Sequence, residues 1–298
     1  MINKIMYRAP LKTPLYLRDK VFPKAARRIG MEEPRDLQRT HIVFDLGSGR
    51  ILDESKKDIP IHPASLTKLM TFSIALDRIK AGHLKEDDII RLSARAQKIR
   101  PPKTRLTEVT ALEAIRVGMP ISFNDLAVAL AEHIAHTEWH FCHEYMNPKA
   151  RALGMKKTEF WNASGLVPRD LPYTGYMHAN VTTANDLRLL VSHIAKNHPE
   201  LFAFSNQREI FIGDRRHKNT NPLLSAKDMD IDGLKTGTLE CAGYHLIATS
   251  RQNGRHIAAV TLGNYYAEQR CDHAKALLAE GHKILSASLK DEMALGVK

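Results

Sequence analysis

The sequence predicts an α+β fold, in which helices flank an antiparallel sheet assembled from both ends of the chain. Apolar runs with strand character lie at residues 41–46, 244–250 and 256–262. Between them, from about residue 84 to residue 205, the apolar residues follow the helical period instead. Strands so far apart in sequence bury their apolar faces by pairing with one another, which leaves the α-helical region as an insertion between the two halves of the sheet.

The first half of the sheet is predicted to be a hairpin that leads into a helix. Residues 41–52 contain a strand (HIVFDL), a turn (LGSG) and the start of a second strand. From Ser65 to about Lys80 the apolar residues recur on one side, as in a helix with one buried face. Gly82 follows as a C-terminal cap.

Apolar periodicity and turn residues also predict the elements of the insertion and of the last third of the chain. Helical patterns cover residues 124–136 and 183–196, and a proline-rich stretch at residues 100–103 interrupts the insertion. Residues 253–254 (Asn-Gly) are a hairpin turn between the last two strands, and residues 272–285 close the chain as an amphipathic helix. We expect the functional site in a cleft between the sheet and the insertion.

Composition divides the chain into three parts. Residues 40–288 are expected to form one large domain, because a chain of 298 residues that is 43% hydrophobic can bury a substantial core. Residues 1–39 form a basic N-terminal extension, and residues 289–298 form a tail. No apolar run approaches the roughly 18 residues of a membrane-spanning helix, and Lys and Arg interrupt any signal-peptide core, so we expect neither.

The net charge of +11 is concentrated near the N-terminus. Residues 1–40 carry ten Lys or Arg against four Asp or Glu. Such an arm is attracted to an anionic membrane surface or an acidic polymer, and a solvated tail is the alternative. The chain has no helix-turn-helix, zinc-finger or aromatic RNA-binding pattern, so nucleic acid is not an expected partner.

Cysteine and histidine spacings favour structural roles. The cysteines are Cys142, Cys241 and Cys271. Their odd number leaves at least one outside any intramolecular disulfide, and each is expected to be buried as a small apolar residue. Four histidines with helical spacing alternate with three glutamates: His133, His136, His140 and His143, with Glu132, Glu138 and Glu144. This alternation favours a solvated amphipathic helix, so we predict no metal and no cofactor.

Ser65 and Lys68 are the first candidate catalytic pair. They stand three residues apart in residues 63–68 (PASLTK), where the chain enters its first long helix, so both side chains share one helix face. A serine hydroxyl needs a base, and a desolvated lysine among other cations can have its pKa lowered enough to accept the proton. Taken alone, the pattern also fits a capping serine beside a solvated lysine.

Two further motifs extend this pair. Ser-Phe-Asn at residues 122–124 lies just before a helix, and Lys-Thr-Gly at residues 235–237 lies just before a predicted hairpin. Each motif alone fits a helix cap or a strand-edge charge. Together and in this order, the three motifs are the set that β-lactamases and penicillin-binding proteins use, which predicts a serine acyl-enzyme.

The chain resembles one family closely, the D-alanyl-D-alanine carboxypeptidases of the low-molecular-weight penicillin-binding proteins. The resemblance runs from about residue 40 to residue 285. Besides the three motifs, it includes residues 127–133 (AVALAEH), 152–155 (ALGM), 158–166 (TEFWNASGL) and 242–244 (AGY). It implies a β-lactamase/transpeptidase-like fold, with residues 40–288 as a penicillin-binding catalytic domain.

The resemblance also implies a role for each catalytic residue. Ser65 attacks the carbonyl between two D-alanines, and Lys68 takes its proton. Ser122, held near Lys68 and Lys235, relays a proton to the leaving amine, and Asn124 orients Lys68 and the substrate amide. The implied catalytic set is therefore Ser65, Lys68, Ser122, Asn124 and Lys235.

The implied substrate-binding residues are Thr236, Gly237, Thr238 and Arg270. In the family's mechanism the backbone amides of Ser65 and Thr238 form the oxyanion hole. Thr236 and Arg270 receive the terminal carboxylate of the substrate. Arg270 has an alternative as an ordinary surface arginine.

Partners and location follow from the same resemblance. The expected substrate is a peptidoglycan stem peptide, β-lactam antibiotics are expected as covalent inhibitors, and the expected location is periplasmic or otherwise extracytoplasmic. Phe123 stands where the family usually has a small residue. It therefore reshapes the cleft, binds substrate differently or packs inward.

Rival functions use the same motifs. A β-lactamase needs a base for deacylation, and Glu159 lies in roughly the corresponding region, although its surroundings fit the carboxypeptidase pattern and predict a surface acid. A DD-endopeptidase would cut cross-linked peptides with the same groups. A third possibility keeps the fold as a non-catalytic peptidoglycan-binding scaffold.

Overall fold

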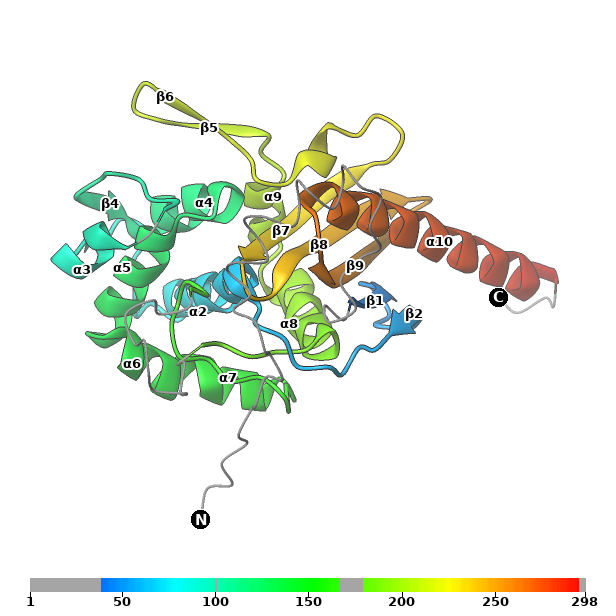
Figure 1. Ribbon diagram of the computed structural model, residues 1–298, viewed down its shortest axis with the longest axis horizontal. Coiled ribbons are helices and arrows are strands. Elements are labelled where there is room, and N and C mark those ends of the chain that lie inside the picture. Colours follow the sequence, from blue (N-terminus) through cyan, green and yellow to red (C-terminus); the bar gives the residue numbers. More distant parts are fainter. Residues whose placement is uncertain (1–38, 100, 167–178, 295–298) are drawn as a thin grey trace, which may run out of the picture. The chain divides into compact units, whose positions relative to one another are not determined.

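A five-stranded antiparallel sheet organises the computed structural model, which describes residues 39–99, 101–166 and 179–294, with side chains up to residue 287. The strand order is β2-β1-β9-β8-β7 (Figure 1). The strands are β1 (Thr40–Asp45), β2 (Ile51–Ser55), β7 (Ile231–Leu239), β8 (Gly243–Gln252) and β9 (Arg255–Asn264). Because β1 pairs with β9, with Thr40 opposite Leu262, the sheet is assembled from both ends of the domain as predicted.

Both predicted hairpin turns are present. Asn253 and Gly254 have positive φ angles of 50° and 72°, the left-handed backbone of a two-residue type I′ turn that suits the twist of a hairpin. In the turn between β1 and β2, Asp45 Oδ1 accepts the backbone N–H groups of Gly47 and Ser48, each at 2.8 Å. Local side-chain bonds of this kind stabilise turns.

Alternation along the strands divides the core into two layers. Ile42 and Phe44 belong to the layer shared with the helical region, and Val43 belongs to a smaller layer beneath α10 (Ala267–Ala294). A Cβ on Gly281 would lie 2.9 Å from Val43 Cγ1, so this glycine lets α10 approach the sheet closely. α10 extends beyond the predicted helix at both of its ends.

The region between β2 and β7 is mostly helical. Its helices are α2 (Lys68–Lys80), α3 (Ala94–Lys98), α4 (Ala111–Ile121), α5 (Asn124–Ala135), α6 (Glu138–His140), α7 (Asn147–Ala152), α8 (Ala184–Asn197) and α9 (Glu200–Ser205). Shorter helical turns are η1 (Ala64–Thr67), η2 (Phe141–Met146) and η3 (Pro222–Ser225). Two ribbons that the sequence analysis missed are β3 (Ile89–Arg91) with β4 (Glu108–Thr110), and β5 (Glu209–Ile212) with β6 (Arg215–Lys218).

The four histidines do not share one helix, so that prediction is wrong. α5 ends at Ala135, because His136 adopts a positive φ of 63°. Thr137 then caps a new helix by accepting the His140 N–H at 3.1 Å. The break places Glu138 in the interior, where only 3% of it is exposed, instead of on the predicted solvated face.

The two ends of the chain are described only in part. The basic arm, apart from Arg39, lies outside the described residues, and its contact with a membrane stays a prediction. Residues 289–294 of the predicted tail continue α10. Within the described part of the chain, no helix combines the length and the apolar character needed to cross a bilayer.

Candidate active site

Ser65 lies on the turn η1, which leads directly into α2. Ala64 has a φ of 50°, a conformation that residues with a side chain rarely adopt. A Cβ on Gly165 would lie 1.8 Å from the Ala64 carbonyl oxygen, so only glycine fits there. The loop of residues 162–166 therefore packs directly against the turn that carries the candidate nucleophile.

Lys68, the first residue of α2, is completely buried beside Ser65. Its Nζ donates hydrogen bonds to Ser65 Oγ at 2.8 Å, Asn124 Oδ1 at 2.7 Å and Ser164 O at 2.8 Å. Burial lowers the pKa of Lys68 well below its ordinary value, and the positive charge of Lys235 lowers it further. The structure thus brings a candidate base into direct contact with the serine.

Asn124 and Asp125 begin α5, and both are buried. Asp125 Oδ2 accepts the N–H of Thr104 at 2.6 Å and its hydroxyl at 2.9 Å, which fastens the chain before β4 to α5. The charge of Asp125 opposes the lowering of the Lys68 pKa. Sequence reasoning missed Asp125, because an acid beside a motif gives no signal of burial.

Ser122 closes α4 in a left-handed conformation, with φ 69° and ψ 34°. Its Oγ is buried and makes no hydrogen bond with any of the described residues. No direct bond joins Ser122 to Lys68 or Lys235 in the described part of the chain. Burying a hydroxyl without a hydrogen-bond partner lowers the stability of the fold by about 1–3 kcal/mol. Because this desolvation has already occurred in the folded protein, the Ser122 hydroxyl can bond a substrate group without losing another partner.

The Lys-Thr-Gly motif lies inside β7, at the edge of the sheet, and directly precedes the hairpin of β8 and β9 as predicted. Lys235 is 1% exposed, and burial together with the charge of Arg270 lowers its pKa to about 7. A Cβ on Gly237 would lie 3.0 Å from the Pro63 carbonyl oxygen. Glycine at this position therefore lets β7 lie close against the turn that carries Ser65.

The predicted carboxylate-binding residues lie along the same strand. Thr236 is buried and donates its hydroxyl to Thr220 Oγ1 at 2.7 Å, whereas Thr238 is exposed. Arg270 on α10 is 7% exposed, which excludes an ordinary surface arginine. Its Nη1 lies 3.3 Å from both Gly237 O and Thr238 Oγ1, so it brings a fixed positive charge to this end of β7.

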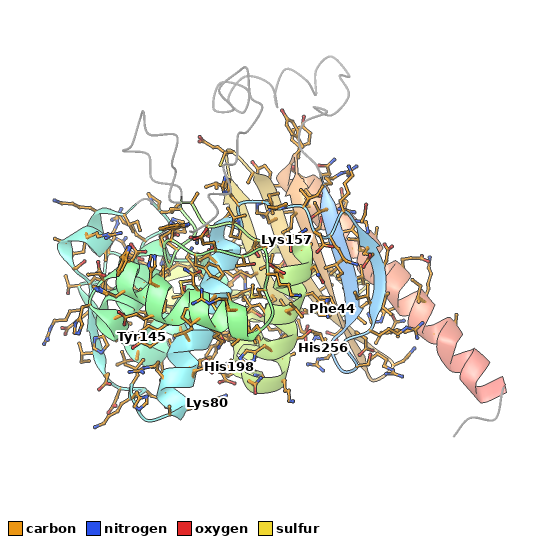
Figure 2. The ribbon with its side chains drawn as sticks, turned by 90° about the horizontal axis from the view of Figure 1, so that it is seen from below. Phe44, Lys80, Tyr145, Lys157, His198 and His256 are labelled. Atoms are coloured by element: carbon orange, nitrogen blue, oxygen red, sulfur yellow. The ribbon has the colours of Figure 1, made fainter. Side chains whose placement is uncertain are left out.

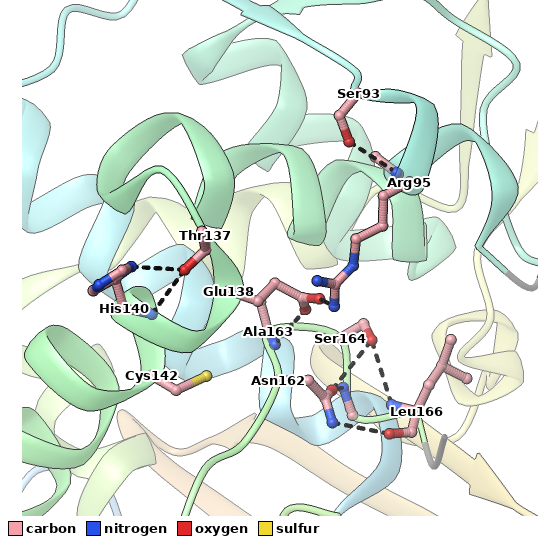
Figure 3. Close-up of polar contacts among 12 residues, drawn as sticks. Ser93, Arg95, Thr137, Glu138, His140, Cys142, Asn162, Ala163, Ser164 and Leu166 are labelled. Carbon is pink, nitrogen blue, oxygen red and sulfur yellow. Dashed lines mark hydrogen bonds and ion pairs between the residues drawn. The ribbon is translucent and has the colours of Figure 1, made fainter. Parts of the chain in front are cut away.

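A buried carboxylate that sequence reasoning assigned to the surface holds the loop at residues 162–166 (Figure 3). Glu138 Oε1 accepts the Ala163 N–H at 3.0 Å, and Oε2 pairs with Arg95. On the other side of the same residue, Thr71 Oγ1 donates to Ala163 O at 2.8 Å. These contacts fix the chain next to Ser164, whose carbonyl accepts the Lys68 hydrogen bond.

The structure also places Phe123, Glu159 and the cysteines. Phe123 is 2% exposed and packs inward, with its ring edge to face against His217 of β6 at a centroid distance of 5.4 Å. Glu159 is exposed, as expected for a surface acid. Cys142 and Cys271 are buried as expected, whereas Cys241 is partly exposed, so the expectation of burial is wrong for this one.

Comparison with known proteins points to one family. The D-alanyl-D-alanine carboxypeptidase model of peptidase family S11 matches residues 30–265. The chain is 31% identical over 262 residues to D-alanyl-D-alanine carboxypeptidase DacC of Escherichia coli K12, covering 85% of this chain and 63% of that protein. It is 29% identical over 232 residues to a D-alanyl-D-alanine endopeptidase of Pseudomonas aeruginosa, covering 74% of this chain and 69% of that protein. The chain thus spans less than two thirds of the DacC relative.

Solved structures give the same answer. Penicillin binding protein 6B from Escherichia coli superimposes with a TM-score of 0.73 and 30% identity, covering 84% of this chain and 79% of that one. Penicillin-Binding Protein D2 from Listeria monocytogenes, in its cefotaxime bound form, gives 0.71 and 28% identity, covering 82% and 96%. Since the family model also matches most of the sequence, this chain belongs to the S11 family of D-alanyl-D-alanine carboxypeptidases.

Proposed function

We propose that this chain is a serine-type D-Ala-D-Ala carboxypeptidase, which removes the terminal D-alanine of peptidoglycan stem peptides through an acyl-enzyme on Ser65. One observation carries the proposal. The buried Lys68 amine lies 2.8 Å from Ser65 Oγ, and its pKa is lowered, as a base that must deprotonate a serine requires. The activity named for DacC supports the choice of substrate.

Acylation uses the residues that line the turn of η1 and the start of α5. Ser65 Oγ forms a bond to the carbonyl carbon of the penultimate D-alanine, while its proton passes to the neutral Lys68 amine. The bond from that carbon to the nitrogen of the terminal D-alanine breaks, and this nitrogen receives a proton through Ser122. Donors from the Ser65 and Thr238 backbone stabilise the oxyanion, an effect worth about 3–4 kcal/mol in serine hydrolases.

Deacylation reverses the proton transfers. Water attacks the ester carbonyl and gives a proton to Lys68, the bond from that carbon to Ser65 Oγ breaks, and Ser65 recovers its proton. The shortened peptide then leaves as a carboxylate. Glu159 is exposed, so nothing in its position favours a β-lactamase over the carboxypeptidase.

Substrate recognition is proposed for the end of β7 that faces α10. Arg270 supplies a positive charge there, Lys235 adds a second charge when it is protonated, and Thr236 supplies a hydroxyl, which together suit a terminal carboxylate. The pKa of Lys235 is lowered to about 7 without a ligand, and a bound carboxylate would favour its charged form. The same groups suit the carboxylate of a β-lactam, and we propose β-lactams as covalent inhibitors. Relatives bound to cefotaxime and ampicillin support this inference. A peptidoglycan substrate implies an extracytoplasmic, periplasmic location.

The deciding experiment separates the carboxypeptidase from its rivals. The protein is incubated with a pentapeptide ending in D-Ala-D-Ala and, separately, with cross-linked muropeptides, and the products are identified by mass spectrometry. The proposal expects loss of one alanine from the pentapeptide. Cleavage of the cross-links alone would make the protein an endopeptidase. No product with either substrate would leave the β-lactamase and the scaffold, and rapid hydrolysis of a chromogenic cephalosporin would identify the β-lactamase.

A further inference from the structure

A second cluster of reactive side chains lies where α2 and α8 end, and the proposed acyl transfer does not use it. Asp77 is in the last turn of α2, His193 is near the end of α8, and His198 directly follows α8. One ligand atom from each of the three lies within 4.8 Å of the other two. Figure 2 shows this side of the domain, with His198, Lys80 and Tyr145 labelled.

We propose that Asp77, His193 and His198 form a binding site for a divalent transition metal ion, with Zn²⁺ as the best match. Two imidazoles and one carboxylate are a usual protein ligand set for zinc when the fourth position is taken by water. Bonds of roughly 2.0–2.2 Å in tetrahedral geometry place neighbouring ligand atoms about 3.4 Å apart, so atoms that lie within 4.8 Å of one another need to shift by only about 1–2 Å.

The ligand atoms of His198 and Asp77 lie side by side at an ion-pair distance. His198 Nε2 lies 2.8 Å from Asp77 Oδ1, yet it makes no well-aligned hydrogen bond with any described residue. An ion placed to one side of this contact can bond both atoms. The His198 ring is fully buried, so its position is fixed by packing.

The far side of the His198 ring faces both an ammonium group and a carboxylate. Lys80 Nζ, which can only donate, lies 3.4 Å from Nδ1, so Nδ1 accepts and the ring hydrogen is on Nε2. Glu200 Oε1 lies 3.7 Å from Nδ1 and 3.1 Å from Lys80 Nζ. Metal binding through Nε2 therefore requires the ring hydrogen to move to Nδ1, where Glu200 can accept it, while Lys80 stays with Glu200.

His193 offers the third ligand from the open side of the cluster. Its Nδ1 lies 3.1 Å from Asn197 Nδ2, which can only donate, whereas its Nε2 is buried and has no hydrogen-bond partner among the described residues. Binding through Nε2 therefore requires the ring hydrogen to move to Nδ1 and the Asn197 amide to turn its oxygen toward it. His193 and Asp77 also line a pocket of about 450 Å³, together with Tyr145 and Lys149. The pocket gives an ion a path from solvent to the ligands.

Lys149 disfavours metal binding through its charge but does not occupy the position proposed for the ion. Its Nζ bonds Asp77 Oδ2 and donates to Ser73 Oγ at 2.6 Å, so Asp77 Oδ1 stays available for a single metal bond. The charge of Lys149 repels a cation at this distance. Without an ion, the same residues form an ion-pair cluster that joins α2, α7 and α8, and the two possibilities respond differently when Lys149 is neutralised.

The test uses the full chain, without a histidine tag and stripped of metal by a chelator. Zn²⁺ is titrated by calorimetry, and Co²⁺ by the visible absorption of its complex. We expect one equivalent to bind, His193→Ala to weaken binding by at least about tenfold, and Lys149→Met to tighten it. His133→Ala, which removes an exposed histidine from α5, is the matched control and should bind as the unaltered protein does.

Two results would overturn the proposal. One is the absence of saturable Zn²⁺ or Co²⁺ binding by the unaltered protein. The other is binding that His193→Ala leaves unchanged, which would place the ion elsewhere. Because His193 is partly exposed, its replacement is compatible with folding, and circular dichroism of each variant checks this point. Loss of peptidase activity would not bear on the result.

Discussion

At the scale of single residues, two buried lysines set the electrostatics of the candidate site and carry much of its proposed chemistry. Lys68 and Lys235 are both shielded from solvent, and both have lowered pKa values. Burying an amine disfavours its charged form, which destabilises the fold but leaves a neutral base at moderate pH. The buried amines therefore lower the free energy of unfolding while they make the proposed base reactive, and the loss of stability can be measured.

Replacing Lys235 by Met should stabilise the protein at neutral pH while it abolishes acylation. Above about pH 10.5 the lysine is neutral in both the folded and the unfolded state. As the pH falls from there to about 7, only the unfolded chain takes up the proton, so the free energy of unfolding of the unaltered protein falls. Each unit of pKa difference is worth ~1.4 kcal/mol. Thermal melts from pH 7 to 10 should show the advantage of Lys235→Met shrinking as the pH rises, and an advantage independent of pH would contradict the assignment.

Ser65→Ala should abolish both peptide hydrolysis and covalent labelling by penicillin, because it deletes the attacking oxygen and little else. Ser65 lies on η1 at the site and not in the core, so the thermal midpoint should change little. Intact mass after incubation with penicillin measures the labelling. Ser48→Ala, at an exposed turn, is the control and should label fully. An adduct on the Ser65→Ala variant would move the nucleophile elsewhere.

The sequence predicts some of these residues and not others, for a physical reason. Ser65 and Lys68 are local neighbours on one turn, so their approach follows from helical spacing alone. Glu138 belongs to the interior only because α5 breaks at His136, and its partner Ala163 comes from a distant loop. Such contacts depend on packing between elements, which spacing does not encode.

At the scale of elements, the site depends on how closely three segments approach one another. β7 lies against η1 because Gly237 has no side chain, and the loop of residues 162–166 does so because Gly165 has none. Glu138 then holds that loop through the Ala163 N–H. The nucleophile turn is thus enclosed by backbone, which fixes its position better than side chains would.

Glu138→Ala should slow acylation roughly ten- to a hundredfold, because a displaced loop misplaces the carbonyl that holds Lys68. Glu138→Gln keeps an oxygen for the Ala163 N–H and should recover most of the rate. Stopped-flow labelling measures the acylation rate and the penicillin dissociation constant separately. The acylation rate should fall in Glu138→Ala, and the dissociation constant should change little. Equal loss in both variants would mean that the charge, and not the hydrogen bond, matters.

Phe123→Ala should destabilise the fold by about 3–5 kcal/mol, the usual cost of deleting a buried ring. The folded fraction should still label with penicillin, because the motif's chemistry belongs to Ser122 and Asn124. Phe211→Ala on β5, where the ring is 63% exposed, is the control and should melt like the unaltered protein. Chemical denaturation gives the stability, and loss of labelling without loss of stability would identify Phe123 as a substrate contact.

Strong local signals explain which elements were predictable. The Asn-Gly turn, the long periodic helices and the apolar strands were found from the sequence and are present. The ribbon of β5 and β6 was missed because its outer strand, residues 215–218 (RRHK), has no apolar alternation. Charged edge strands take their stability from their neighbours, so their own sequence carries little pattern.

At the scale of the whole molecule, the family fold and the exposed Glu159 together predict slow release of penicillin. The opened β-lactam stays tethered on Ser65 and occupies the approach of water, whereas the leaving D-alanine of a peptide diffuses away. We expect the adduct to last minutes or longer, against a turnover time on the order of a second or less for an ordinary enzyme. Intact mass after stoichiometric mixing should show one added penicillin. Free penicilloate within seconds would identify a β-lactamase instead.

The placement of β1 between β2 and β9 has a consequence for the protein during its synthesis. The strand β1, about twenty residues before Ser65, finds its second partner, β9, only after residue 264 has left the ribosome. Until then β1 and β2 are an isolated two-stranded ribbon, which is marginally stable in water and has an open edge that can pair with another chain. The nascent polypeptide is therefore expected to be inert and prone to aggregation until β9 has emerged, and to depend on chaperones over that interval.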